Sequence, residues 1–353
     1  MIQDPGADKM GRFLRACRRE ETDCTPIWIM RQAGRYLPEY RKLREKHAML
    51  EMAKTPELAV RVTLLPVERF DLDAAILFSD IMVPLGGMGV SFRIEENVGP
   101  VIDEPIRGEA QVRGLRVFEA ARDVPFVLEA IRLLRAELGG KVPLIGFAGA
   151  PFTLATYLIE GRSPRRFRWT KALMLDRRDL WDGLMRRLTD TAIAYLRAQV
   201  EAGAQALQLF DSWAGNLSPS QYARFVLPHS RRIFEALKGC GVPLIHFGTE
   251  TAMLLEQMAE AGADVVGADW RIPLDEAWRR IGPTRAIQGN LDPAVLFAGP
   301  ETIRREARAV LDLASGRPGH IFNLGHGILP DTPVESVRQL VDFVHEASHR
   351  PIS

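Results

Sequence analysis

The sequence predicts a single-domain α/β protein with the (β/α)8 architecture of a TIM barrel over residues 1–353. Eight apolar segments rich in β-forming residues alternate with segments of helical periodicity. Such alternation indicates parallel strands joined by crossover helices, and the chain is long enough for eight such units. A doubly wound open sheet is the alternative, but no GxGxxG motif follows the first predicted strand.

The first part of the chain contains a lead-in and the one departure from this rhythm. Residues 1–24 form the N-terminal lead-in, with a short helix inside it. A first strand at 27–30 precedes helical segments, one of which begins at Pro56 after the capping residue Thr55. Residues 83–106 combine glycines, prolines and an alternating apolar pattern, which predicts a small β-ribbon.

The other elements follow from short apolar runs that end in polar or glycine residues. The eight predicted strands cover residues 27–30, 73–78, 141–147, 204–210, 242–247, 263–268, 285–288 and 320–324. Helical periodicity follows the strands, and the clearest segments cover residues 41–53, 56–70, 108–138 and 334–347. A basic segment at 162–168 interrupts another helical stretch and is expected on the surface or at an interface.

Composition and charge exclude several functional classes. The formal net charge of +1 provides no basic surface for nucleic acid, so an anionic ligand must be bound by a local cluster. The cysteines Cys17, Cys24 and Cys240 form no zinc-binding pattern, which favours a reducing, cytoplasmic compartment. We expect no secretory signal, and no membrane span because no run of about 18 apolar residues occurs.

The most distinctive local feature is the segment Pro26–Tyr40, an apolar run that turns abruptly polar. Arg31 and Arg35 flank a Gln-Ala-Gly turn, in which Gly34 permits a bend or a close approach of the backbone. A guanidinium presents a fork of donors that matches carboxylate or phosphate oxygens. The spacing fits either an anion-binding site or two surface ion pairs, and by itself does not separate these alternatives.

Polar residues follow every predicted strand, at the position where active sites lie in this fold. The C-terminal ends of the strands meet at one face of the barrel, so these residues are candidates for the site. They are Arg31, Gln32, Arg35, Ser79, Asp80, Thr153, Tyr157, Asp211, Ser212, Thr249, Asp269, Asn290, Asp292 and His326. Because any such barrel carries polar loops at this face, position alone assigns no roles.

Three candidates have competing structural interpretations. Asp80 is either a catalytic acid or the cap of the segment that follows it. Tyr157 lies in a helical segment, where packing in the core is the more common role. His326 stands between two glycines, in a loop with little core to fill, which favours a functional role.

Other polar residues are better explained by local structure. Asp292 precedes Pro293 and a helical pattern, which predicts an N-cap. Asp269 is expected to neutralise Arg271. His246 lies inside an apolar strand and is expected in the core or behind the site.

The pattern indicates neither a metal site nor a cofactor site. The acids are spread one per loop, without the pair or triple that a divalent ion needs. No clear phosphate-binding glycine loop is present, and no lysine ends a strand for Schiff-base chemistry. An arginine cluster with an acid, a tyrosine, a serine and a histidine fits cofactor-free decarboxylation or another reaction of a polycarboxylate.

Seven segments carry motifs in a characteristic order. They are PIWIMRQAGRYLPEY (26–40), FSDI (78–81), GFAGAPFTLATYLIEG (146–161), FDSWAG (210–215), HFG (246–248), GNLDP (289–293) and NLGHGILPDTP (323–333). In this order, over almost the whole chain, they resemble the uroporphyrinogen decarboxylase family of tetrapyrrole biosynthesis. The first and last segments are the most specific.

The resemblance implies a homodimeric (β/α)8 barrel that uses neither a metal nor an organic cofactor. It implies stepwise removal of CO₂ from the four acetate side chains of uroporphyrinogen III, which gives coproporphyrinogen III. It implies a substrate-binding loop whose arginines face carboxylates and which consists of Arg31, Gln32, Ala33, Gly34 and Arg35.

The resemblance also implies roles at the later strand ends. Asp80 is the central catalytic acid and faces the pyrrole N–H groups, while Arg31 is a candidate proton donor or relay. The further substrate contacts are Tyr157, Phe210, Ser212 and His326, with Phe210 packing on the macrocycle.

Two other functions compete with this interpretation. Corrinoid methyltransferases of the same barrel superfamily resemble the chain in fold, but hold zinc through a His-x-Cys pair and a later cysteine. Here Phe247 and Gly248 follow His246, and no cysteine follows Cys240, so that zinc site cannot form. A non-catalytic tetrapyrrole-binding protein is the second alternative, and the intact set of polar strand-end residues argues against it.

Overall fold

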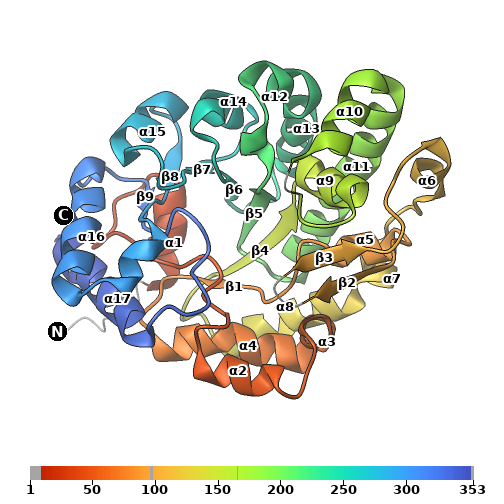
Figure 1. Ribbon diagram of the computed structural model, residues 1–353. Helices are drawn as coiled ribbons and strands as arrows, with labels where there is room; N and C mark the ends of the chain where they lie inside the picture. The colour runs from red at the N-terminus through yellow and green to blue at the C-terminus, as the bar shows by residue number, and fades with distance from the viewer. Residues whose placement is uncertain (1–8, 96–97, 165, 351–353) are drawn as a thin grey trace.

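The computed structural model describes residues 9–95, 98–164 and 166–350, which form a curled parallel sheet surrounded by helices (Figure 1). The seven sheet strands occur in the spatial order β1-β4-β5-β6-β7-β8-β9. They are β1 (Ala75–Ile76), β4 (Leu144–Gly149), β5 (Ala206–Asp211), β6 (Leu244–Gly248), β7 (Val265–Gly267), β8 (Ala286–Gln288) and β9 (His320–Ile321). Each one pairs in parallel with the next.

Helices connect the strands and lie outside them. They are α1 (Lys9–Cys17), α2 (Pro38–Arg44), α3 (Met49–Lys54), α4 (Pro56–Arg69), α5 (Val83–Gly87), α6 (Glu109–Gly114), α7 (Ala120–Asp123), α8 (Pro125–Leu138), α9 (Pro151–Glu160), α10 (Arg168–Asp176), α11 (Arg178–Ala202), α12 (Pro219–Phe225), α13 (Leu227–Leu237), α14 (Leu255–Glu260), α15 (Leu274–Ile281), α16 (Pro300–Ala314) and α17 (Val334–Ser348). Short 3₁₀ helices are η1 (Ala214–Asn216), η2 (Ala252–Leu254) and η3 (Pro293–Phe297). No helix of the described residues combines the length and the apolar character needed to cross a membrane.

Residues 26–28 complete the barrel between β9 and β1, and we call them the first barrel position because they precede the other strands in the chain. Ile27 forms an isolated parallel bridge with Phe322, whose N–H donates to the Pro26 carbonyl at 2.8 Å. On the other side, the Asp73 N–H donates to the Ile27 carbonyl at 2.9 Å. The predicted strand at 27–30 is therefore a single bridge residue, because the chain turns away directly after it. The ring of strands nevertheless closes, as the sequence predicted.

A chain of hydrogen bonds between buried side chains crosses the interior of the barrel. The Trp28 indole N–H donates to Gln288 Oε1 at 3.0 Å, and Gln288 Nε2 donates to Gln208 Oε1 at 3.1 Å. These three side chains come from three different positions of the ring. Since the interior is filled by side chains, a ligand has to bind above it, at an end of the barrel.

Helix boundaries differ from the predicted ones at two places. The predicted helix 41–53 is split into α2 and α3, and the predicted segment 108–138 is split into α6, α7 and α8. Pro125 begins α8, as a proline at the first helical position does. Thr55 precedes α4 as predicted, but its hydroxyl donates to the Glu51 carbonyl at 2.9 Å instead of capping.

The β-ribbon is confirmed, although its first part is helical. Strands β2 (Phe92–Glu95) and β3 (Gly99–Ile102) pair antiparallel, while helix α5 occupies the beginning of the predicted segment 83–106. The Ile102 N–H donates to the Gly161 carbonyl at 2.8 Å, so the ribbon is attached at the end of α9. Residues 96–97 of the predicted ribbon lie outside the described residues.

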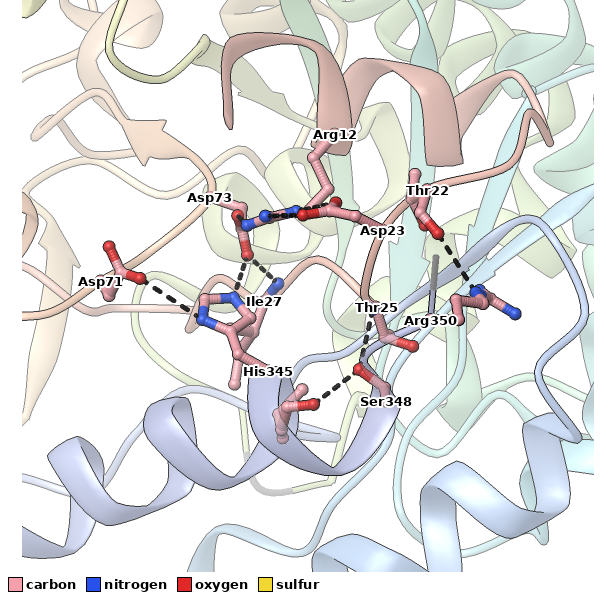
Figure 2. A network of polar contacts seen from close by, with 11 residues as sticks. Arg12, Thr22, Asp23, Thr25, Ile27, Asp71, Asp73, His345, Ser348 and Arg350 are labelled. Atoms are coloured by element: carbon pink, nitrogen blue, oxygen red, sulfur yellow. Dashed lines mark hydrogen bonds and ion pairs between the residues drawn. The ribbon is translucent and has the colours of Figure 1, made fainter. Parts of the chain in front are cut away.

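A buried charge network joins the beginning and the end of the described chain where the barrel closes between residues 26–28 and β1, here called the closing seam (Figure 2). Asp73 Oδ1 accepts from Arg12 at 2.6 Å, and Arg12 also binds Asp23 through Nε at 2.7 Å. Asp73 Oδ2 accepts from the Ile27 N–H and lies 2.7 Å from His345 Nε2. Asp73 thus fixes α1, the first barrel position and α17 at one point.

Candidate functional site

The loop after the first barrel position presents Arg31 at the C-terminal face of the barrel. Arg31 is exposed and has a φ of 65°, a left-handed conformation that is uncommon for a residue with a side chain. A Cβ on Gly34 would lie 2.7 Å from the Arg31 carbonyl oxygen, so the turn needs a glycine there. The predicted close approach of the backbone at Gly34 is therefore confirmed.

Gln32 holds this loop to the neighbouring strand. Its Oε1 accepts from the Ile29 N–H, and its Nε2 donates to the Ala74 carbonyl, both at 3.0 Å. The side chain is completely buried. Gln32 therefore serves the loop through its side chain, which leaves Arg31, Ala33 and Arg35 as the more accessible residues of the loop.

Asp80 follows β1 at the same face and is half-buried. Its Oδ1 accepts from the Met82 N–H at 2.8 Å, so Asp80 caps the turn before α5; the N-cap residue of α5 itself is Met82, and this helix has no side-chain cap. Burial raises the pKa of the Asp80 carboxyl, and the Met82 N–H and the charge of Arg31 oppose this rise. The cap leaves the second carboxylate oxygen available, so capping and a catalytic role are compatible.

Tyr157 lies on α9 with its ring almost buried, and it belongs to the same group. Burial raises the pKa of its phenol; the charge of Asp80 adds to this rise, whereas that of Arg31 opposes it. The Tyr157 ring packs edge-on against Trp213, with 5.9 Å between ring centroids. Tyr157 is therefore both a core residue, as its helical position suggested, and a neighbour of Asp80 and Arg31.

His326 comes from the last loop and meets the first one. A Cβ on Gly327 would lie 2.4 Å from Arg31 Cδ, which shows how closely the two loops pack. Burial and the charge of Arg31 lower the pKa of His326, so the neutral imidazole is favoured. Its Nδ1 accepts from the Gly327 N–H at 2.7 Å, which assigns the proton of the neutral ring to Nε2.

Phe210 and Ser212 lie at the end of β5. The Phe210 ring packs edge-on against Phe147 and Phe247, at centroid distances of 5.4 and 6.2 Å. The Ser212 carbonyl accepts from Thr249 Oγ1 at 2.6 Å. The link from this pair to the first group runs through Trp213, which follows Ser212 and packs on Tyr157.

The residues explained by local structure behave as predicted. Asp292 Oδ1 accepts from the Ala294 N–H at 2.9 Å, as an N-cap does. Asp269 forms an ion pair with Arg271 at 2.9 Å. His246 is fully buried and packs on Phe234 of α13, at 5.1 Å between ring centroids.

Sequence reasoning missed the aromatic and glycine contacts around the site. Trp270 packs edge-on against His326 at 6.2 Å, and Gly327 makes room for the side chain of Arg31. The Gly-His-Gly pattern around His326 was a visible signal, because a glycine beside a candidate residue often marks a close approach. No group of three or more His, Cys, Asp or Glu side chains in the described parts of the chain could hold a metal ion.

The fold and these contacts define a class: a (β/α)8-barrel enzyme whose strand-end loops join cationic, acidic, phenolic and imidazole groups. The solved structure of a methyltransferase from Methanosarcina mazei has the same fold, with a TM-score of 0.82 and 23% identity over 96% of this chain and 98% of that one. At that identity the likeness concerns the fold alone.

Comparison with known sequences gives the family. The family model described as uroporphyrinogen decarboxylase matches residues 8–347. Uroporphyrinogen decarboxylases of Carboxydothermus hydrogenoformans and Sorangium cellulosum are 54% and 57% identical, each over 95% of this chain and 96% and 95% of theirs. The Streptomyces coelicolor enzyme is 56% identical over 99% of this chain and 98% of its own. The chain belongs to the uroporphyrinogen decarboxylase family, and the resemblance found in the sequence is confirmed.

Proposed function

We propose that this enzyme decarboxylates the four acetate side chains of uroporphyrinogen III to methyl groups and produces coproporphyrinogen III and CO₂. The proposal is supported by the position of Arg31 in a member of this family: its charge acts on Asp80, Tyr157 and His326, and its side chain packs against Gly327 beside His326. The substrate is a polycarboxylate with a central ring of pyrrole N–H groups. It therefore needs cations for its periphery and an anion for its centre.

The chemistry requires an electron sink. A proton added to the pyrrole carbon beside the acetate-bearing position makes the ring cationic. The carbon–carbon bond to the carboxylate then breaks, CO₂ leaves, and the bonding electrons neutralise the ring as an exocyclic methylene. Protonation of that methylene, with loss of the proton from the ring carbon, gives the methyl group.

Asp80 is suited to stabilise the cationic ring. As a carboxylate in a partly dry barrel mouth, it would face the pyrrole N–H groups and interact more strongly with the cation than with the neutral substrate. Such differential stabilisation can contribute several kcal/mol. The Met82 N–H holds one carboxylate oxygen at 2.8 Å and so orients the other.

Arg31 and Arg35 are suited to hold the carboxylates of the substrate. A guanidinium beside the leaving carboxylate also stabilises the ground state, so the arginines contribute mainly to orientation. Arg31 is our candidate for delivering or relaying the proton, although a guanidinium is intrinsically a weak acid. Further contacts to the macrocycle would come from Tyr157, Phe210, Ser212 and His326.

The family resemblance also leads us to expect a cytoplasmic homodimer that works without a metal or an organic cofactor. Sedimentation analysis of the purified protein tests the dimer. A mass of a single chain at assay concentrations would contradict it.

The proposed activity is tested by anaerobic incubation of the enzyme with uroporphyrinogen. We expect products with seven, six, five and finally four carboxyl groups, separated by chromatography after oxidation. Binding of the substrate without loss of carboxyl groups would favour the non-catalytic alternative. Stoichiometric zinc in the purified protein would favour the methyltransferase alternative.

A further inference from the structure

A second polar cluster lies behind the site, between β5, β6 and the helices that cover them. The side chains of Thr153, Asp211, Tyr222, Ser230 and His246 have no exposed surface. Buried polar groups are costly unless they are partnered, and a carboxylate is the most costly of these. Such a group calls for an explanation, and the proposed chemistry uses none of the five.

Thr153 connects this cluster to the loop that carries Ser212. Its hydroxyl donates to Asp211 Oδ1 at 3.0 Å and accepts from the Trp213 N–H at 3.2 Å. Thr153 belongs to the first turn of α9, and Asp211 ends β5. One hydroxyl therefore ties the helix that bears Tyr157 to both sides of Ser212.

The loop after β5 is also held from the opposite side. Thr249 Oγ1 donates to the Ser212 carbonyl at 2.6 Å. A Cβ on Gly215 would lie 2.4 Å from the Thr249 carbonyl oxygen, so the two loops are in direct contact. With Trp213 packed on Tyr157, the position of Ser212 and that of Tyr157 are coupled.

The other side of Asp211 faces groups that are only loosely paired. Asp211 Oδ2 lies 3.9 Å from His246 Nε2, beyond hydrogen-bonding distance. Among the described residues, neither this oxygen nor the His246 ring nitrogens have a hydrogen-bond partner. The distant His246 therefore contributes little to the stability of the buried Asp211 carboxylate. The evident role of Asp211 lies in its other oxygen, Oδ1, which accepts from the Thr153 hydroxyl.

We propose that Thr153 and Asp211 are positioning residues for the reaction. Asp211 holds the Thr153 hydroxyl, the hydroxyl holds the Trp213 backbone, and this arrangement fixes Ser212 and Tyr157 relative to the bound macrocycle. The proposal rests on the proposed function, because it is for that substrate that the two side chains must be fixed. Since Ser212 and Tyr157 are proposed substrate contacts, their displacement should mainly weaken substrate binding; a misplacement of about 1 Å can cost up to about 10²-fold.

The test compares Thr153→Val, which removes the hydroxyl at nearly constant size, with Thr153→Ser, which retains it. Thr189→Val is the matched control, because Thr189 is also fully buried and its hydroxyl donates to the Met185 carbonyl on α11. We expect Thr153→Val to lower kcat/KM for uroporphyrinogen about tenfold, mostly through KM. Thr153→Ser should stay within about twofold of the wild type because it keeps the hydroxyl, and so should Thr189→Val because the hydroxyl that it removes does not bond the loop after β5.

Hydrogen–deuterium exchange supplies a readout that does not depend on activity. In Thr153→Val the Trp213 N–H loses its acceptor, so the peptide covering residues 210–217 should exchange faster, while peptides of α11 should not change. Thr153→Ala provides the same test with less crowding if the valine variant does not fold. Unchanged exchange and unchanged kcat/KM would overturn the positioning role. A wild-type enzyme without decarboxylase activity would overturn only the proposed function. Hydrogen–deuterium exchange of residues 210–217 would still show whether Thr153 holds the Trp213 backbone.

Discussion

Gly327 and Arg31 illustrate how single residues set the geometry of the site. The Arg31 side chain occupies the space beside Gly327 that a Cβ would need. Arg31 itself has a left-handed backbone, which costs about 1–2 kcal/mol for a residue with a side chain. The hydrogen bonds of Gln32 to Ile29 and Ala74 hold the loop in this conformation.

Gly327→Ala should therefore impair substrate binding. The new Cβ would lie 2.4 Å from Arg31 Cδ and would force the flexible arginine side chain to move. We expect KM for uroporphyrinogen to rise about tenfold, equivalent to ~1.4 kcal/mol. The control is Gly114→Ala, because nothing lies within 4 Å of a Cβ at Gly114. Equal KM values for the two variants would contradict this role of Gly327.

The protonation of Asp80 should limit activity at acidic pH. Burial raises the pKa of its carboxyl, so it becomes protonated at a higher pH than an ordinary aspartate. Because the carboxylate is the form that stabilises the cationic ring, kcat should fall as the pH decreases through this raised pKa. The ordinary pKa of an aspartate side chain is 3.8, so the decrease in kcat should occur at a pH above this value. A kcat that stays constant down to pH 3.8 would argue against Asp80 as the required anion.

At the scale of elements, the closing seam depends on Asp73 and its partners. The first barrel position contributes only one bridge residue and lacks the backbone hydrogen bonds of a complete strand pairing. Side-chain hydrogen bonds and ion pairs therefore hold this part of the barrel together. The Asp73 carboxylate binds the Ile27 N–H, Arg12 of α1 and His345 of α17 (Figure 2). This explains why helices at opposite ends of the described sequence pack at one seam.

His345→Gln should lower stability in a pH-dependent way. Despite its burial, hydrogen bonds and charge from Asp71 and Asp73 raise the pKa of His345 from 6.5 to about 9. Its stabilising contribution is fully present below pH 6.5 and is lost as the pH rises through 9. Since His345 is largely buried, the contribution corresponds to up to about 3 kcal/mol.

Thermal unfolding at pH 6 and pH 10 measures this effect. The Tm difference between the wild type and His345→Gln should be large at pH 6 and should narrow at pH 10. His47→Gln is the control, because the solvent-exposed pair of His47 with Glu51 contributes little to stability. A constant Tm difference across this pH range would show that the charge of His345 does not stabilise the seam.

At the scale of the whole molecule, the sequence was most informative where elements are regular. Apolar runs located every strand of the sheet, because strands buried on both faces contain few polar residues. The strand at 27–30 was too long, since periodicity does not show that the backbone turns at Arg31. The helix at 41–53 was too long for a similar reason, as its pattern continues across the break between α2 and α3.

The site was predicted in part. Motifs singled out Arg31, Asp80, Tyr157 and His326, and in the structure the charge of Arg31 acts on the other three; their roles in the reaction stay a prediction. The contact between Gly327 and Arg31, and the bond from Thr153 to Asp211, join residues far apart in the sequence. No local pattern records such contacts, so they required the fold.

The kcat of Asp80→Asn is the measurement that best examines whether Asp80 stabilises the cationic ring. The fold should persist, because asparagine can still accept from the Met82 N–H and no longer buries a charge. Asp292→Asn is the matched control, since asparagine caps a helix as well as aspartate does.

We expect Asp80→Asn to lower kcat for uroporphyrinogen about 10²–10³-fold, the range for loss of one group that stabilises transition-state charge. Its Tm should equal or exceed that of the wild type, and Asp292→Asn should retain full turnover. A folded Asp80→Asn enzyme with near-normal kcat would show that the Asp80 carboxylate does not stabilise the cationic ring.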